Sequence, residues 1–152
     1  MSFESLFKKK KIKKTHHHFP LKDSTFRNRD LIKGIKVILS GNMTMSDMTT
    51  KFEKTFLKKI KTQHALMVNS GSSANLLALQ CLINPYRKNR LKKGDEVLMP
   101  AVCWPTSLWP IIQCGLKPVF VDVDKENFNI NLKDLEKKIS KKTKALMLVH
   151  VL

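Results

Sequence analysis

Four short apolar runs that alternate with helix-like stretches constrain the fold of this chain more than any other feature. Each run is continuous rather than alternating, which is typical of strands covered on both faces. The expected strands are 65–68, 96–99, 119–123 and 145–152, and the expected helices between them are 72–82, 105–114 and 132–139. Since strands that alternate with helices form βαβ units, the pattern predicts an α/β fold with a mostly parallel sheet.

The printed sequence ends inside the fourth expected strand, at 149–152. A parallel strand buried on both faces needs a neighbouring strand and a following helix. We therefore expect a partial domain, which further sequence or another polypeptide would complete. Without that completion, the last strand would leave an apolar edge exposed.

The first 64 residues have a different pattern. Residues 1–25 contain a lysine run and three adjacent histidines, and we expect them to form a basic flexible arm. Residues 26–64 carry two apolar stripes at helical spacing, the first of which ends before Gly41, and they are predicted to be an N-terminal helical segment. Residues 65–152 are then the incomplete α/β domain.

The charge balance is strongly basic, with 29 Lys and Arg against 12 Asp and Glu and a formal net charge of +17. Such a balance attracts polyanions. The lysines are nevertheless dispersed over helix-like faces, apart from the run at 8–14, and no familiar nucleic-acid module is present. Nucleic acid is therefore not the expected partner, although a non-enzymatic basic α/β protein that binds polyanions or nucleic acid through the lysine-rich arm is the alternative interpretation.

Several functional classes are disfavoured by the remaining composition. No apolar run approaches the roughly 20 residues of a membrane span, and the N-terminus lacks the apolar core of a secretory signal. Three scattered cysteines without zinc spacing favour reduced thiols in a cytoplasmic protein. The adjacent histidines do not share one face of a helix or strand, so we expect no metal site.

The densest chemical signal is the segment VNSGSSAN at 68–75, where a strand leads directly into a helix. Gly71 permits a tight turn and a close approach to the backbone, while Ser72 and Ser73 offer hydroxyls and N–H groups at the positive end of the helix. This arrangement suits a phosphate, although it is neither a P-loop nor a dinucleotide-binding loop. An ordinary serine N-cap explains the same residues equally well.

The segment PAVCWPT at 100–106 follows the second expected strand. It lies at the carboxyl end of that strand, the side on which open α/β sheets bind their ligands. Trp104 would stand close to the serine-rich turn and offer a flat face to a heteroaromatic ring. A core or interface tryptophan is the alternative.

These motifs occur in a specific order. The order is NSGSSAN at 69–75, GDEV at 94–97, WPT at 104–106 and PVFVDV at 118–123. Together they resemble the DegT/DnrJ/EryC1/StrS family of pyridoxal-phosphate-dependent sugar aminotransferases, which have the type I aspartate-aminotransferase fold. The resemblance extends from about residue 41 to residue 152, and the stretch 104–115 is similar to the branch that dehydrates CDP-linked 4-keto-6-deoxyhexoses.

The resemblance implies a fold, a cofactor and a substrate. The chain would be the N-terminal part of the large domain, a partial three-layer sandwich. Ser72 and Ser73 would bind the phosphate of pyridoxal 5′-phosphate, with Gly71 in the turn and Trp104 stacked on the pyridine ring. The substrate would be a nucleotide-linked keto-deoxy sugar, in lipopolysaccharide or deoxysugar biosynthesis, and the complete enzyme would be a homodimer.

The resemblance also implies what the chain lacks. The family's Schiff-base lysine, which is a histidine in the dehydrase branch, and the aspartate that pairs with the pyridinium nitrogen belong to later motifs. None of the lysines here has the matching context, so no residue is predicted to be catalytic. We expect the 152 residues to be inactive alone.

Overall fold

The computed structural model describes residues 26–44 and 46–150. The predicted basic arm, with its lysine run and histidines, lies outside the described residues. The contacts divide the chain into two units, one that ends at Phe52 and one that begins at Glu53. Each unit is described by itself.

The first unit contains helix α1 (Asn28–Leu39) and the start of helix α2 (Asp47–Ile60). At the start of α1 the Asp30 carboxylate accepts a hydrogen bond from the Arg27 N–H over 3.0 Å. Gly41 follows the helix with a φ of +72°, a left-handed conformation that glycine adopts without strain. The C-cap residue itself is Ser40, and Gly41 follows it in the left-handed conformation that ends the helix.

The second unit contains the parallel sheet. After helix α3 (Gly71–Ile83), the chain forms β1 (Glu96–Pro100), α4 (Pro105–Gln113), β2 (Lys117–Val121), α5 (Leu132–Lys138) and β3 (Thr143–Leu146). The strands are parallel in the order β2-β1-β3, so the predicted α/β fold with a parallel sheet is confirmed.

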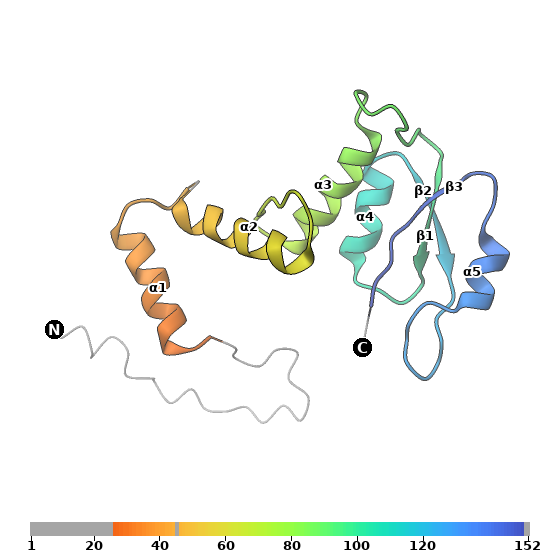
Figure 1. The fold of residues 1–152 in the computed structure, drawn as a ribbon. Helices are drawn as coiled ribbons and strands as arrows, with labels where there is room; N and C mark the ends of the chain where they lie inside the picture. Colours follow the sequence, from red (N-terminus) through yellow and green to blue (C-terminus); the bar gives the residue numbers. More distant parts are fainter. Residues whose placement is uncertain (1–25, 45, 151–152) are drawn as a thin grey trace. The chain divides into compact units, whose positions relative to one another are not determined.

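The connections place helices on both faces of the sheet. The chain crosses from β1 to β2 in one direction and from β2 past β1 to β3 in the other. Because parallel crossovers are right-handed, α4 and α5 must then cover opposite faces. Figure 1 shows this arrangement, with α3 beside α4 on one side of the sheet and α5 on the other.

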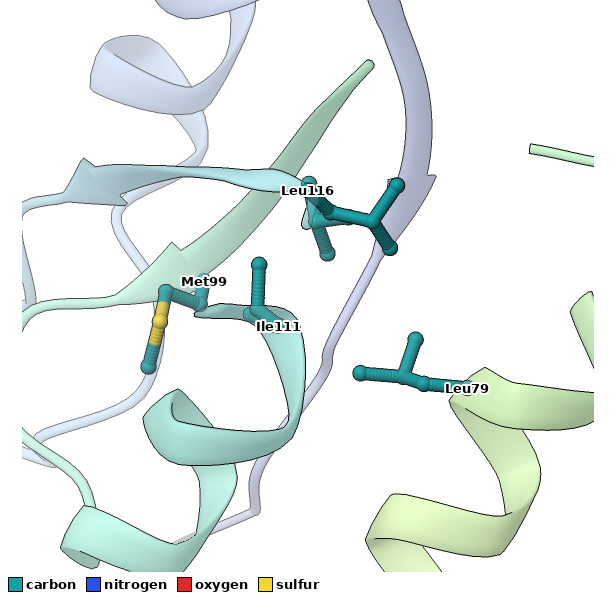
Figure 2. Packing of buried hydrophobic residues seen from close by; sticks show 5 residues of the cluster. Leu79, Met99, Ile111 and Leu116 are labelled. Carbon is teal, nitrogen blue, oxygen red and sulfur yellow. The ribbon is translucent and has the colours of Figure 1, made fainter. Parts of the chain in front are cut away.

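The core of the second unit lies between β1 and the α3–α4 layer. All five residues of β1 are buried, as expected for the central strand of a sheet covered on both faces. Met99 of β1 packs in one cluster with Leu79 of α3 and Ile111 of α4. Leu116, the residue before β2, belongs to the same cluster (Figure 2).

Pro110 is buried inside α4, yet the helix is continuous. A proline within a helix cannot donate to the carbonyl four residues earlier, which here belongs to Thr106. The Asn75 side chain of α3 donates to that carbonyl instead, with its Nδ2 3.4 Å from the oxygen. The hydrogen bond that α4 lacks is thus replaced by one that joins α4 to α3.

One predicted strand is wrong. Residues 65–68 form no strand, and the Leu66 side chain is 72% exposed. Here the Met67 N–H donates to the Glu53 carboxylate over 2.8 Å rather than to a neighbouring strand. An apolar run becomes a strand only against a partner, and the described residues provide none for this segment.

Two other strands differ from their predicted bounds. β2 begins two residues early and ends at Val121, because the Asp122 N–H donates to the Asp134 carboxylate of α5. β3 also begins two residues early and ends at Leu146, although the Met147 N–H still donates to the Leu98 carbonyl. The last two residues of the predicted strand lie outside the described residues.

None of the helices in the described part of the chain has both the length and the apolar composition of a membrane span.

Candidate functional site

The first turn of α3 contains the predicted serine-rich site. Ser70, rather than Ser72 or Ser73, is the N-cap: its Oγ accepts from the Ser73 N–H over 3.1 Å. The Ser70 hydroxyl also donates to Ser73 Oγ over 3.1 Å. The N–H groups of Gly71 and Ser72 precede the first hydrogen bond of the helix, so they have no acceptor within it. Both N–H groups and the Ser72 hydroxyl remain suited to an anion at the positive end of α3.

Gly71 does not have the conformational role predicted for it. It is the first residue of α3 and its φ is not positive. A Cβ atom at this position would meet no atom of the chain within 4 Å. The fold itself therefore does not require glycine here, and the open space next to the backbone is available to a ligand.

A hollow of about 290 Å³ lies between α3 and α4. Its walls come from both helices and consist of Ser72, Ser73, Leu76, Thr106, Trp109, Pro110 and Gln113. The Asn75–Thr106 hydrogen bond joins the second turn of α3 to the first turn of α4. The structure thus brings the two predicted serines into one concave surface.

Thr106 belongs to the WPT motif but is not among the predicted site residues, and Trp109 and Gln113 belong to none of the four ordered motifs. Their common place in the hollow depends on how α4 packs against α3. The one available signal is spacing, because positions 106, 109, 110 and 113 share a face of the predicted helix at 105–114. The sequence does not show where α3 lies, so it does not show which element packs against that face.

Trp104 lies outside the hollow. It is the N-cap residue of α4, and its carbonyl accepts from the Ser107 N–H over 2.9 Å. Its side chain is 67% exposed, so it is not a core tryptophan in the described structure. Trp104 therefore stands at the carboxyl end of β1, as predicted, but the structure does not bring it into the same hollow as Ser72 and Ser73.

The electrostatics of this region come from dipoles rather than from charged side chains. None of the residues that line the hollow is ionisable. Burial raises the pKa of the Cys103 thiol, next to Trp104, and therefore favours its neutral form. An anion at this site would be held by N–H groups, hydroxyls and the α3 dipole.

Comparison with known proteins adds to this geometry. A sequence model of the DegT/DnrJ/EryC1/StrS aminotransferase family matches residues 26–152. GDP-4-keto-6-deoxy-D-mannose 3-dehydratase of Yersinia pseudotuberculosis is 39% identical over 141 residues, which are 93% of this chain and 36% of that protein. The lipopolysaccharide biosynthesis protein RfbH of Salmonella typhimurium is 44% identical over 119 residues, 78% of this chain and 27% of its own length.

A solved structure shows the same relation. The E. coli GDP-4-keto-6-deoxy-D-mannose-3-dehydratase with bound hydrated PLP superimposes with a TM-score of 0.76 at 40% sequence identity. The superposition covers 84% of this chain and 33% of that enzyme. The chain therefore spans about a third of the length of the proteins it matches.

Proposed function

Because the chain belongs to the DegT/DnrJ/EryC1/StrS aminotransferase family, we propose that it is the N-terminal part of a pyridoxal 5′-phosphate-dependent aminotransferase or dehydrase. Its substrate is a nucleotide-linked keto-deoxy sugar, in cell-surface polysaccharide or deoxysugar biosynthesis. The names of the relatives, which include GDP- and dTDP-sugar dehydratases, support this class of substrate. The single observation that carries the proposal is the first turn of α3, which offers unpaired N–H groups next to a hollow.

The residues of that turn fit the phosphate of the cofactor. The Gly71 and Ser72 N–H groups and the Ser72 hydroxyl are donors, and the Ser73 hydroxyl can donate while its oxygen accepts from Ser70. The open space at Gly71 lets a phosphate reach the backbone. Trp104, exposed at the carboxyl end of β1, offers its indole to the pyridine ring.

When bound, pyridoxal phosphate supplies an electron sink for the bond that breaks in the substrate. The part played by this chain is to hold the phosphate and to orient the ring. No residue of the chain is proposed as a catalytic acid, base or nucleophile. We propose that the remaining two thirds of the complete protein provide those groups, that the complete enzyme is a homodimer, and that it works in the cytoplasm.

The proposed organisation of the sequence is the predicted one. Residues 1–25 form a basic arm, 26–64 a helical segment and 65–152 the incomplete cofactor-binding domain. The alternative function, polyanion binding through the arm, depends on residues outside the described part of the chain. No observation on the described residues favours that arm-based function.

Gly71→Ala tests the proposal with little risk to the fold. The new methyl group meets no atom of the chain, but it would occupy the space through which a phosphate approaches the N–H groups. We expect Gly71→Ala to lower the affinity for pyridoxal 5′-phosphate, measured by equilibrium dialysis, to that for pyridoxal, which lacks the phosphate. The melting temperature should not fall, because alanine is the better helix former.

Gly34→Ala is the matched control. Gly34 also lies in a helix, α1, with open space where a Cβ would stand. This variant should bind pyridoxal 5′-phosphate as the unmodified chain does. Equal affinities of the unmodified chain for pyridoxal 5′-phosphate and pyridoxal would contradict the proposed phosphate site.

A further inference from the structure

The amino-terminal ends of the three strands gather basic side chains from three separate parts of the sequence. The first residues of β1, β2 and β3 are paired in register, Glu96 opposite both Lys117 and Thr143. The loops before them are joined by backbone hydrogen bonds of 2.9 Å, from Gly94 to Gly115 and from Glu96 to Lys142. Glu96, Lys117 and Thr143, which are far apart in the sequence, therefore lie together at one end of the sheet.

We call this end of the sheet the basic edge. It carries nine basic side chains, all exposed, and two acidic ones, a formal charge of +7. Six of the basic residues lie in the joined loops or at the first two positions of a strand: Lys92, Lys93, Lys117, Lys141, Lys142 and Lys144. The other three, Arg87, Lys88 and Arg90, lie earlier in the loop that follows α3, and the acidic residues are Asp95 and Glu96. Within the described ranges, Lys117 is the one member of the nine that takes part in an ion pair, with Glu96 over 3.1 Å. Most of this positive charge is thus uncompensated by the protein.

An exposed aromatic ring lies next to these charges. Tyr86, in the loop that follows α3, is 96% exposed and directly precedes Arg87. The Tyr86 N–H donates to the Asn84 side chain over 3.0 Å, which fixes the backbone of the turn that presents the ring. A flat aromatic ring beside a row of cations is the combination with which proteins bind single-stranded nucleic acid, by base stacking and phosphate contacts.

We propose that the basic edge binds single-stranded nucleic acid without sequence specificity. Neighbouring strands lie about 4.8 Å apart, so the three loops present cations over roughly 10 Å. The edge lies at the end of the sheet opposite to the Ser72–Trp104 region, because all strands run in parallel. The proposal is therefore independent of the proposed cofactor site, and it concerns the folded unit rather than the arm at 1–25.

The test measures binding of a fluorescently labelled oligo(U) to the complete chain by anisotropy over a series of salt concentrations. The edge variant combines Arg87→Gln, Lys88→Gln, Arg90→Gln and Lys92→Gln. The control variant combines Lys33→Gln, Lys36→Gln, Lys54→Gln and Lys58→Gln, which remove the same net charge from exposed positions of α1 and α2. The edge variant should bind about tenfold or more weakly at low salt, and its log–log salt slope should fall by up to about 3.

Tyr86→Ala separates stacking from charge. It should weaken binding of oligo(U) by about fivefold or more, and it should leave binding of double-stranded DNA unchanged, because paired bases are not free to stack on the ring. The proposal is wrong if Tyr86→Ala has no effect on the binding of oligo(U). It is also wrong if heparin displaces oligo(U) completely and its binding depends on the same edge residues, because the site would then recognise negative charge alone.

The same variants in a chain without residues 1–14 separate the edge from the lysine run. The loss caused by the edge substitutions should persist there. The proposal is overturned if the control variant loses as much affinity as the edge variant, or if removal of residues 1–14 alone abolishes binding. All four edge substitutions are at exposed positions, and circular dichroism melting of each variant verifies that the fold is retained.

Discussion

The two ends of the small sheet present different electrostatics to their surroundings. At the carboxyl end, the hollow beside α3 contains no ionisable side chain, and its donors are N–H groups and hydroxyls fixed by the helix. At the amino end, nine exposed basic side chains come from the loops before the strands and from the first positions of β2 and β3. Fixed dipoles favour one anion in one position, whereas flexible cations attract extended polyanions under low salt. The same backbone can therefore support a selective site and an unselective surface.

The largest expected loss of stability comes from a core residue, because both ends of the sheet require the folded core. Ile111 of α4 is fully buried against β1 in the core cluster. Ile111→Ala should reduce the free energy of unfolding by about 2–5 kcal/mol, because it leaves a cavity at the centre of the unit. Denaturant unfolding measures this change. The neighbouring Ile112, 46% exposed, is the control, and a similar loss for Ile112→Ala would show that the core is wrongly placed.

The next effect is confined to the carboxyl end. Ser70→Ala removes the oxygen that accepts from the Ser73 N–H at the start of α3. We expect a loss of about 1 kcal/mol in the free energy of unfolding, the usual cost of removing an N-cap. Binding of oligo(U) should not change. Ser72→Ala, which removes an exposed hydroxyl without a capping role, should leave stability unchanged; a larger loss for Ser72→Ala would contradict the assigned cap.

A similar or smaller effect is expected where α3 meets α4. Asn75→Ala removes the donor to the Thr106 carbonyl, which Pro110 leaves without a helical partner. The expected loss is about 0.5–1.5 kcal/mol in the free energy of unfolding. Gln80→Ala, at an exposed position of the same helix, is the control. Equal free energies of unfolding for the Asn75 and Gln80 variants would show that the hydrogen bond between the helices does not contribute to stability.

The smallest effect concerns the amino end and depends on pH. The Ser140 hydroxyl donates to Glu96 over 2.7 Å, and together with Lys117 it lowers the pKa of this carboxyl. Because the pKa of Glu96 is lower in the folded state, its ionised carboxylate stabilises the fold at pH values above the ordinary pKa of 4.5. This contribution to the free energy of unfolding is lost as the pH falls through the pKa of the folded state. Glu96→Gln should therefore flatten the decline of the melting temperature below about pH 4.5.

Glu136→Gln is the control for that experiment, because Glu136 is exposed on α5. Its melting temperature should follow the pH dependence of the unmodified chain. Identical acid profiles for Glu96→Gln and the unmodified chain would mean that the Ser140 and Lys117 contacts do not stabilise the folded state.

Elements with local signals were predictable from the sequence. β1 is flanked by Gly94 and followed by the Trp104–Pro105 helix start, and its predicted and observed bounds differ by one residue. The segment 65–68 has an equally apolar sequence but forms no strand, because a strand depends on a partner that local sequence does not provide. The serine pair of α3 was visible as a turn motif, whereas its α4 neighbours depend on helix packing.

The basic edge illustrates the same limit. In the sequence its lysines and arginines are distributed between positions 87 and 144, so they suggest a dispersed charge. Parallel pairing collects the starts of all strands at one edge, and this converts the dispersed residues into one surface. The sequence predicted the parallel sheet, but the order β2-β1-β3 and the register were needed to decide which loops meet.

The hydrogen bond from Asn75 to the Thr106 carbonyl has a consequence for the order in which the protein opens. Because Pro110 cannot donate to it, the Thr106 carbonyl in the first turn of α4 has this hydrogen-bond partner only while α3 is docked. Separation of the two helices would then expose the amides of both to solvent in one step. Amide hydrogens in α3 and α4 should accordingly exchange with deuterium as one cooperative unit, at a common free energy of opening.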